Sequence, residues 1–425
     1  MKKTPLLLFV LVGSFFSCNQ AKKDPIAKQK TEKEEVVTVK HFPNPSTLNS
    51  QTPRLFSNGG QLYFSWVAQQ GSISTLYSSV FENGAWRGAV QVNSGEDWFT
   101  NWADFPAIAE NNGNILTHFL QKSASGTYTY DIKLNLFSAG AQNWKKGFTP
   151  HSDGTESEHG FVSMLPHGKN DFLITWLDGR NTVGENKTQD THTHGMGPMT
   201  LRAAFVNSDG TITNSTQLDG RVCECCGTAA TNTEKGPMIA YRDRSDTEIR
   251  DISVVRYDKT NGWSEPQTIG KDRWEIAGCP VNGPAMDALG NNVVLTWFTA
   301  TTGAGDVKVA FSKDSGETFG PPFRIDVGNA IGRVDCVMLN EEKAAVLWME
   351  PKGADTVILL MEINNHGYTQ PPITIARTSA ERASGFPQLE KLGDQLFIAW
   401  TDVSGGASTI KTAVVQVADL NVEMN

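Results

Sequence analysis

The chain has 425 residues, with 37 lysines and arginines against 46 aspartates and glutamates, so its formal net charge is −9. Proteins that bind nucleic acid need a basic surface for the phosphates, and this charge balance argues against a nucleic-acid partner. Thirty-nine glycines and nineteen prolines are typical of many tight turns, and a hydrophobic content of 39% is enough for a core of alternating strands.

The first residues have the features of an export signal. Lys2 and Lys3 precede an apolar run from Leu6 to Val12, and Ser17 stands directly before Cys18. A basic start, a short apolar segment and a small residue before the cleavage point are typical of secretory signals. The apolar run is too short to span a bilayer as a helix.

Cys18 resembles the cysteine of a bacterial lipobox, which implies cleavage before Cys18 and lipidation of its thiol. An ordinary signal peptide with an incidental cysteine is the alternative. We expect a signal peptide over residues 1–17, a lipidated cysteine with a charged tether over 18–35, and one folded domain over 36–425. The protein would then be exported and held on a bacterial membrane, at the periplasmic side or the cell surface.

A repeated pattern runs through the rest of the chain. Seven apolar stretches, spaced 51 to 65 residues apart, each close on an aromatic residue or a histidine: Trp66, His118, Trp176, Tyr241, Trp297, Trp348 and Trp400. Each repeat contains several short strands, and repeats of this length are typical of a β-propeller. We predict an all-β propeller with seven blades. Six blades is the alternative, if the second repeat, which closes on histidine, is degenerate.

The last repeat lacks a clear fourth strand, whereas the segment from Val36 to Phe42 has strand character. We expect this N-terminal strand to complete the last blade, because a ring closed in this way leaves no exposed sheet edge. In antiparallel blades, the loops between second and third strands share one face with the loops between blades. We call this the upper face, and the face with the remaining turns the lower face.

One turn carries a family resemblance. Ser312, Asp314, Gly316, Thr318 and Phe319 follow the pattern S-x-D-x-G-x-T-F. This pattern resembles the Asp-box, or BNR repeat, of bacterial sialidase-like propellers. The resemblance implies the propeller fold, with this turn in a structural role on the face opposite the active site.

Sialidases of this family hold a carboxylate with three arginines, attack with a tyrosine paired to a glutamate, and use an aspartate as acid and base. The positions that match these roles are Arg54, Arg333 and Arg242 (or Arg244) for the clamp, Asp104 for the acid, and Tyr241 as the tyrosine closest to the nucleophile's place. The resemblance implies an exo-sialidase-like glycoside hydrolase or a lectin-like relative that binds an acidic glycan. Whether the chain is an enzyme stays open. Trp102 and Trp274, in loops between blades, either stack on a sugar or fill the top of the ring.

Cysteines gather in the upper-face loops between blades three, four and five. Cys223, Cys225 and Cys226 stand in one loop and Cys279 in the next. In an exported protein such cysteines either pair as disulfides, with Cys336 as a further candidate, or bind a metal.

A long insertion between the second and third strands of blade three carries His192 and His194 on the same face. Thiolates favour Cu(I), and imidazoles suit copper and zinc, so both histidines join Cys223, Cys225, Cys226 and Cys279 as candidate ligands. Three hypotheses follow: a glycan-directed sialidase-like protein, a copper- or zinc-binding redox lipoprotein, and a scaffold that binds partners through its upper face. The expected partners are a glycan or other small ligand and, through the lipid, a membrane.

Overall fold

The computed structural model describes Met1 and residues 38–183, 197–367 and 369–421. Its strands all belong to one compact unit, Val37–Asn425. The signal peptide, Cys18 and the tether lie outside the described residues, as do His192 and His194, so export, lipid anchoring and the role of these histidines stay predictions. Within the described ranges, no helix is long and apolar enough to cross a membrane.

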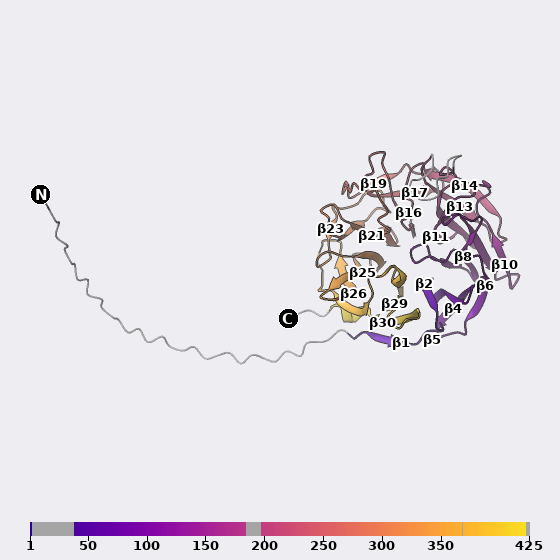
Figure 1. The fold of residues 1–425 in the computed structure, drawn as a ribbon, viewed down its shortest axis with the longest axis horizontal. Coiled ribbons are helices and arrows are strands. Elements are labelled where there is room, and N and C mark those ends of the chain that lie inside the picture. Colours follow the sequence, from indigo (N-terminus) through magenta and orange to yellow (C-terminus); the bar gives the residue numbers. More distant parts are fainter. Residues whose placement is uncertain (2–37, 184–196, 368, 422–425) are drawn as a thin grey trace. The chain divides into compact units, whose positions relative to one another are not determined.

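Seven antiparallel sheets follow one another around a ring (Figure 1). Blades one to three comprise β2 (Ser50–Ser57), β3 (Leu62–Gln70), β4 (Ile73–Glu82), β5 (Ala85–Trp86) and β6 (Val90–Gly95); β7 (Ile108–Asn111), β8 (Asn114–Lys122), β9 (Tyr130–Ser138) and β10 (Asn143–Phe148); β11 (His159–His167), β12 (Asp171–Asp178), β13 (Thr200–Val206) and β14 (Ile212–Asp219). Blades four and five comprise β15 (Ala229–Thr233), β16 (Gly236–Arg242), β17 (Ile252–Asp258), β18 (Gly262–Trp263) and β19 (Gln267–Ile269); β20 (Ala285–Leu289), β21 (Asn292–Thr299), β22 (Asp306–Ser312) and β23 (Phe323–Arg324). Blades six and seven comprise β24 (Gly332–Met338), β25 (Lys343–Lys352), β26 (Asp355–Asn364) and β27 (Ile373–Thr378); β28 (Gln388–Leu392), β29 (Gln395–Asp402), β30 (Thr409–Gln416) and β1 (Lys40–Phe42). Two short 3₁₀ helices, η1 (Arg382–Ser384) and η2 (Val417–Asn421), complete the described elements. The prediction of seven blades is confirmed, and the alternative of six is wrong.

The repeated closing residues lie on the second strand of each blade, where they fill the space between neighbouring sheets. Trp176 and Trp348 are fully buried, and Trp176 packs in one cluster with Tyr130 and Leu134 of the preceding blade. Blade two uses His118 instead, whose Nδ1 accepts a hydrogen bond of 3.0 Å from the backbone N–H of Ala107. The histidine therefore occupies the same core position as the tryptophans, and its blade is complete.

The last blade is closed by the N-terminal strand, as predicted. β1 pairs with β30 in antiparallel register, with Lys40 opposite Val414 and Phe42 opposite Thr412. The strand is shorter than the segment expected from the sequence. Beyond it, the Asn44 side chain donates to the Ile410 carbonyl at 2.9 Å and continues the contact between the two ends of the ring.

The innermost strands β2, β7, β11, β15, β20, β24 and β28 line a central channel of about 780 Å³. Its aspartates connect adjacent blades: Asp287 accepts from the backbone N–H of Met338 at 2.7 Å, and Asp335 from that of Leu389 at 2.8 Å. Burial raises the pKa of both carboxyls to about 6. These side chains therefore serve as links between blades.

The Asp-box turn joins β22 to β23 and has the structural role expected of it. Asp314 accepts from the backbone N–H of Thr318 at 2.9 Å, and the Ser312 hydroxyl accepts from that of Gly316. Gly316 has a φ of 79°, and a Cβ there would approach Met238 Sδ to 2.4 Å. Only glycine satisfies both the left-handed backbone and this close approach.

Candidate functional site

Four cysteines meet on the upper face between blades three, four and five. Cys223 Sγ lies 3.3 Å from Cys226 Sγ and 3.9 Å from Cys225 Sγ, and these three sulfur atoms lie within 4.8 Å of one another. Cys223 and Cys226 are buried, whereas Cys279 is exposed, and the Cys225 thiol holds the pKa of Cys279 below its ordinary value by hydrogen bonding. All four are free thiols in this structure. The predicted grouping of the two cysteine loops is thus present.

A buried ion network surrounds the thiols. Arg250 is 1% exposed and donates to Cys223 Sγ at 3.2 Å, to Glu224 at 2.9 Å and to Glu248 at 2.9 Å. Arg244 pairs with the same two glutamates. Burial alone would raise the pKa of the Cys223 thiol, but hydrogen bonds from Cys225 and Cys226 together with the Arg250 charge hold it well below its ordinary value. The environment therefore stabilises a thiolate.

Cys336 does not belong to this group. It lies on β24, packed in the hydrophobic core between blades five and six, and burial raises the pKa of its thiol well above the ordinary value. The prediction that Cys336 is a further candidate for a disulfide with these cysteines is wrong, because β24 places it in the channel wall.

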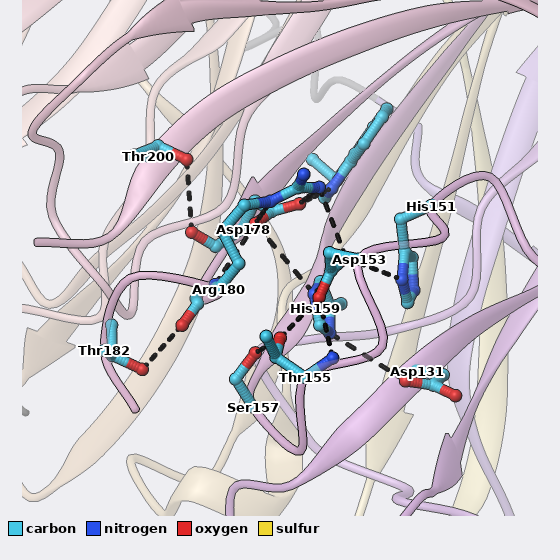
Figure 2. Close-up of polar contacts among 12 residues, drawn as sticks. Asp131, His151, Asp153, Thr155, Ser157, His159, Asp178, Arg180, Thr182 and Thr200 are labelled. Atoms are coloured by element: carbon cyan, nitrogen blue, oxygen red, sulfur yellow. Dashed lines mark hydrogen bonds and ion pairs between the residues drawn. The ribbon is translucent and has the colours of Figure 1, made fainter. Parts of the chain in front are cut away.

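A second cluster lies where blades two and three meet (Figure 2). The imidazole rings of His151 and His159 stack with centroids 3.9 Å apart, and Asp153 Oδ2 lies 3.4 Å from His151 Nδ1 and 3.3 Å from His159 Nε2. Asp131 and Asp178 approach His159 from either side, each at 3.9 Å.

A tyrosine shared by two carboxyl groups adjoins this cluster. The Tyr130 hydroxyl lies 3.0 Å from Asp104 Oδ2 and 2.6 Å from Glu158 Oε1. Burial raises the pKa of Asp104 to about 7 and that of Glu158 to about 8. Asp104 is 2% exposed and Tyr130 fully buried, so Glu158, which is half-buried, is the member that can meet a ligand.

The predicted arginine clamp does not form. Arg242 is 1% exposed, and its guanidinium donates to the carbonyls of Asn282, Arg250 and Phe298 at 2.7–3.0 Å. Arg333 is 4% exposed and donates to Ser384 and to the carbonyls of residues 380, 381 and 385. Arg54 lines the channel and donates to Gln388 at 2.6 Å. Arg242 and Arg333 therefore hold loops together, and neither presents a free guanidinium face to a substrate.

The other residues that the resemblance assigns to the site are also engaged in contacts within the protein. Tyr241 is fully buried and its hydroxyl donates to Asp219 at 2.6 Å, so it is not placed to attack a substrate. Asp104 is too buried to touch one directly. The Trp274 ring lies over the Arg242 guanidinium, with its centroid 5.1 Å from Cζ, and the half-buried Trp102 ring lies over that of Arg333 at 4.8 Å. These contacts favour the alternative in which both rings fill the top of the propeller.

Sequence reasoning missed most of the histidine cluster and the Tyr130 group. The loop from His151 to His159 holds two histidines and three acidic residues within nine positions, a density that was a usable signal. Asp131 and Tyr130 carried no such signal, since they lie on the preceding blade and only the fold brings them to the loop.

No family model and no curated protein matches this chain. Solved structures do. A polysaccharide lyase of family PL25, an ulvan lyase bound to -[GlcA(1-4)Rha3S]-, is 11% identical, with 89% of this chain and 96% of that chain covered at a TM-score of 0.53. Polysaccharide lyase Uly1 is 9% identical, with 92% and 94% covered at 0.51. The NanB sialidase of Streptococcus pneumoniae, as a K499G mutant, is 10% identical, with 90% and 71% covered at 0.45.

What these structures share with the chain is the propeller. The predicted propeller fold is confirmed, and the two reported structures with a TM-score above 0.5 are both polysaccharide lyases. At identities of 9–11% they assign no residue and no reaction to this chain.

Proposed function

We propose that this protein is a metal-binding propeller that holds Cu(I) or Zn(II) on its upper face through the thiolates of Cys223, Cys225 and Cys226, with Cys279 as the fourth ligand. The carrying observation is the spacing of the sulfur atoms, 3.3 Å and 3.9 Å from Cys223. Thiolates that share one tetrahedral metal at about 2.3 Å stand roughly 3.8 Å apart. A disulfide would need about 2.05 Å.

The surroundings support this proposal through charge. Several thiolates around one ion leave a net negative site, and the buried guanidiniums of Arg250 and Arg244 lie beside it. Glu224 and Glu248 fix both arginines in place, as partners beyond the ligands do in metal sites. Soft thiolate ligands favour Cu(I), and four thiolates equally suit Zn(II). His192 and His194 remain predicted additional ligands.

The test is metal content of the full-length protein, isolated from an oxidising compartment, together with titration by Cu(I) and by Zn(II). We expect one thiolate-bound equivalent, recognised by thiolate-to-metal charge-transfer absorption after cobalt(II) substitution. Cys225→Ser should abolish this absorption. The matched control is Cys336→Ser, which removes a buried thiol outside the group and should leave the absorption unchanged.

A disulfide-bonded protein would contradict the metal-binding proposal. If mass spectrometry after alkylation shows two disulfides among the four cysteines, and Cys225→Ser leaves metal binding as in the wild type, the cysteines are covalent links between loops and the proposal fails.

A second candidate function is binding or cleavage of an acidic glycan on the same face. It is favoured by the Tyr130 hydroxyl shared between Asp104 and the half-buried Glu158, an arrangement suited to proton transfer. The same fold serves two polysaccharide lyases, one of them bound to a glucuronate-containing glycan.

This candidate is tested with uronate-containing and sialylated polysaccharides. If the chain cleaves one of them, Glu158→Gln should reduce the rate by about 10²–10⁴-fold, the usual contribution of a positioned acid or base. Glu156→Gln, two residues away and exposed, is the control and should retain the rate. No cleavage or binding of any acidic glycan by the wild type would dismiss the candidate.

A further inference from the structure

We infer a second metal site, for a divalent ion of the zinc, iron or manganese type, formed by His151, His159 and Asp131 where blades two and three meet. One ligand atom from each of these residues lies within 4.8 Å of the others. Two imidazoles and one carboxylate are a donor set that borderline divalent metals take in proteins, with coordination positions left open. This site is separate from the thiol group and does not depend on it.

The ring nitrogens of the two histidines are available to an ion. His159 is fully buried, and neither of its ring nitrogens forms a hydrogen bond, although Asp153 Oδ2 lies 3.3 Å from Nε2 and Asp131 Oδ1 lies 3.9 Å from Nδ1. His151 Nε2 is buried without a hydrogen bond as well. A buried polar atom left unpaired costs about 1–3 kcal/mol, and several occur together here.

Asp153 has the position of a supporting carboxylate. Its Oδ2 lies next to Nδ1 of His151 and Nε2 of His159, while its Oδ1 accepts from the backbone N–H of Thr155 at 3.0 Å. Carboxylates commonly hold the non-ligating nitrogen of metal-bound histidines, fixing the tautomer and the ring orientation. This arrangement leaves His151 Nε2 and His159 Nδ1 for the ion.

Arg180 decides on which side of His159 the ion binds. Its guanidinium pairs with Asp178 at 2.6 Å and lies 3.3 Å from Asp153, so a positive charge already occupies the side formed by Asp153 and Asp178. A second cation there would be repelled. The side facing Asp131 also has a cation, Lys133, but its ammonium pairs at 3.3 Å with Asp131 Oδ2, whereas the oxygen that faces His159 Nδ1 is Oδ1. That oxygen pairs with no lysine or arginine among the described residues.

The Asp131 side chain is 22% exposed, which gives the ion a path from solvent and leaves room for water in the open positions. The site adjoins Glu158, which precedes His159 in the sequence and forms a bridge with Tyr130. A ligand bound to the ion would therefore lie beside the one half-buried carboxyl of the Tyr130 group.

The experiment titrates zinc(II) into chelator-stripped, full-length protein carrying Cys223→Ser, Cys225→Ser and Cys226→Ser, which leaves only one thiol of the proposed thiolate site. We expect one equivalent of zinc, with only nitrogen and oxygen in its first coordination sphere by X-ray absorption spectroscopy. Adding His151→Gln should weaken this binding at least 100-fold. Asp153→Asn, which keeps all three ligands, should weaken it about 10–100-fold.

His167→Gln is the matched control, because His167 stands on the same strand as His159 but packs on Phe205, and it should bind zinc like its parent. Thermal unfolding without metal checks that each variant folds. If the triple-serine variant binds no zinc, or binds it equally well after His151→Gln, the inference is overturned, and the proposal for the thiols stands or falls on its own experiment.

Discussion

Replacing Arg242 with alanine is expected to lower the free energy of unfolding by about 3–5 kcal/mol, more than other exchanges of a single arginine on the upper face. The guanidinium is buried and donates hydrogen bonds to the backbone carbonyls of three segments, at Asn282, Arg250 and Phe298. Alanine leaves these carbonyls without their donor and opens a cavity under Trp274. Equilibrium unfolding in urea measures the loss.

Arg221→Ala is the control, because Arg221 is 40% exposed and pairs with an even more exposed Asp246, so its loss should cost under about 1 kcal/mol. For Arg242→Lys, the loss of unfolding free energy should lie between these two values, since an ammonium keeps the positive charge but lacks the planar set of N–H donors of a guanidinium. A loss below 1 kcal/mol for Arg242→Ala would show that Arg242 does not hold the loops together. The effect should extend to the thiols, because Cys223 N–H donates to the Arg242 carbonyl at 3.0 Å.

The stability of the wild type should fall as the pH rises from about 4 to about 7, and Asp104 should account for a large part of the change. Burial raises the pKa of this carboxyl from 3.8 in the unfolded chain to about 7 in the folded protein. Between these values the folded state keeps a proton that the unfolded state has released, so each rise in pH favours unfolding. The contribution that is present below about pH 4 and lost by about pH 7 is about 4 kcal/mol.

Asp104→Asn tests this directly, because the amide resembles the protonated carboxyl and does not titrate. In urea unfolding at pH 4.5, 6 and 8, the free energy of unfolding should decline less for the variant than for the wild type, the difference being most of the Asp104 contribution. For Asp246→Asn, at an exposed site, it should decline as in the wild type. Parallel curves for Asp104→Asn and the wild type would mean that Asp104 is ionised in the folded protein throughout. Asp287 and Asp335 contribute in the same direction in all these proteins.

The fold could be predicted because its causes repeat along the chain. Trp66, Trp176, Trp297 and Trp348 mark the same strand position in blades one, three, five and six, and each fills the same kind of space between sheets. The pairing of β1 with β30 followed from the missing strand of the last repeat and the strand character near residue 40. Such features depend on local pattern and on the need to close a ring.

The site could be predicted only in part, since partners decide the role of a charged side chain. The cysteines were found because thiols are rare and three stand within four positions. Arg242 and Arg333 have the sequence positions of substrate ligands, yet main-chain carbonyls from neighbouring loops occupy both. Asp131 and His159 meet only because blade two lies beside blade three, a contact that no spacing in the sequence displays.

The shared last blade also sets the order in which the protein can form. Six sheets are built from consecutive strands and can pair as soon as those strands are available, whereas the seventh needs Lys40 and Val414 together. That contact spans residues 40 to 414, and the entropy of closing so long a loop is recovered only once β1 and β30 meet. Before they meet, the outer edge of β30 is unpaired, so a chain whose ring is still open is the species most exposed to aggregation and proteolysis.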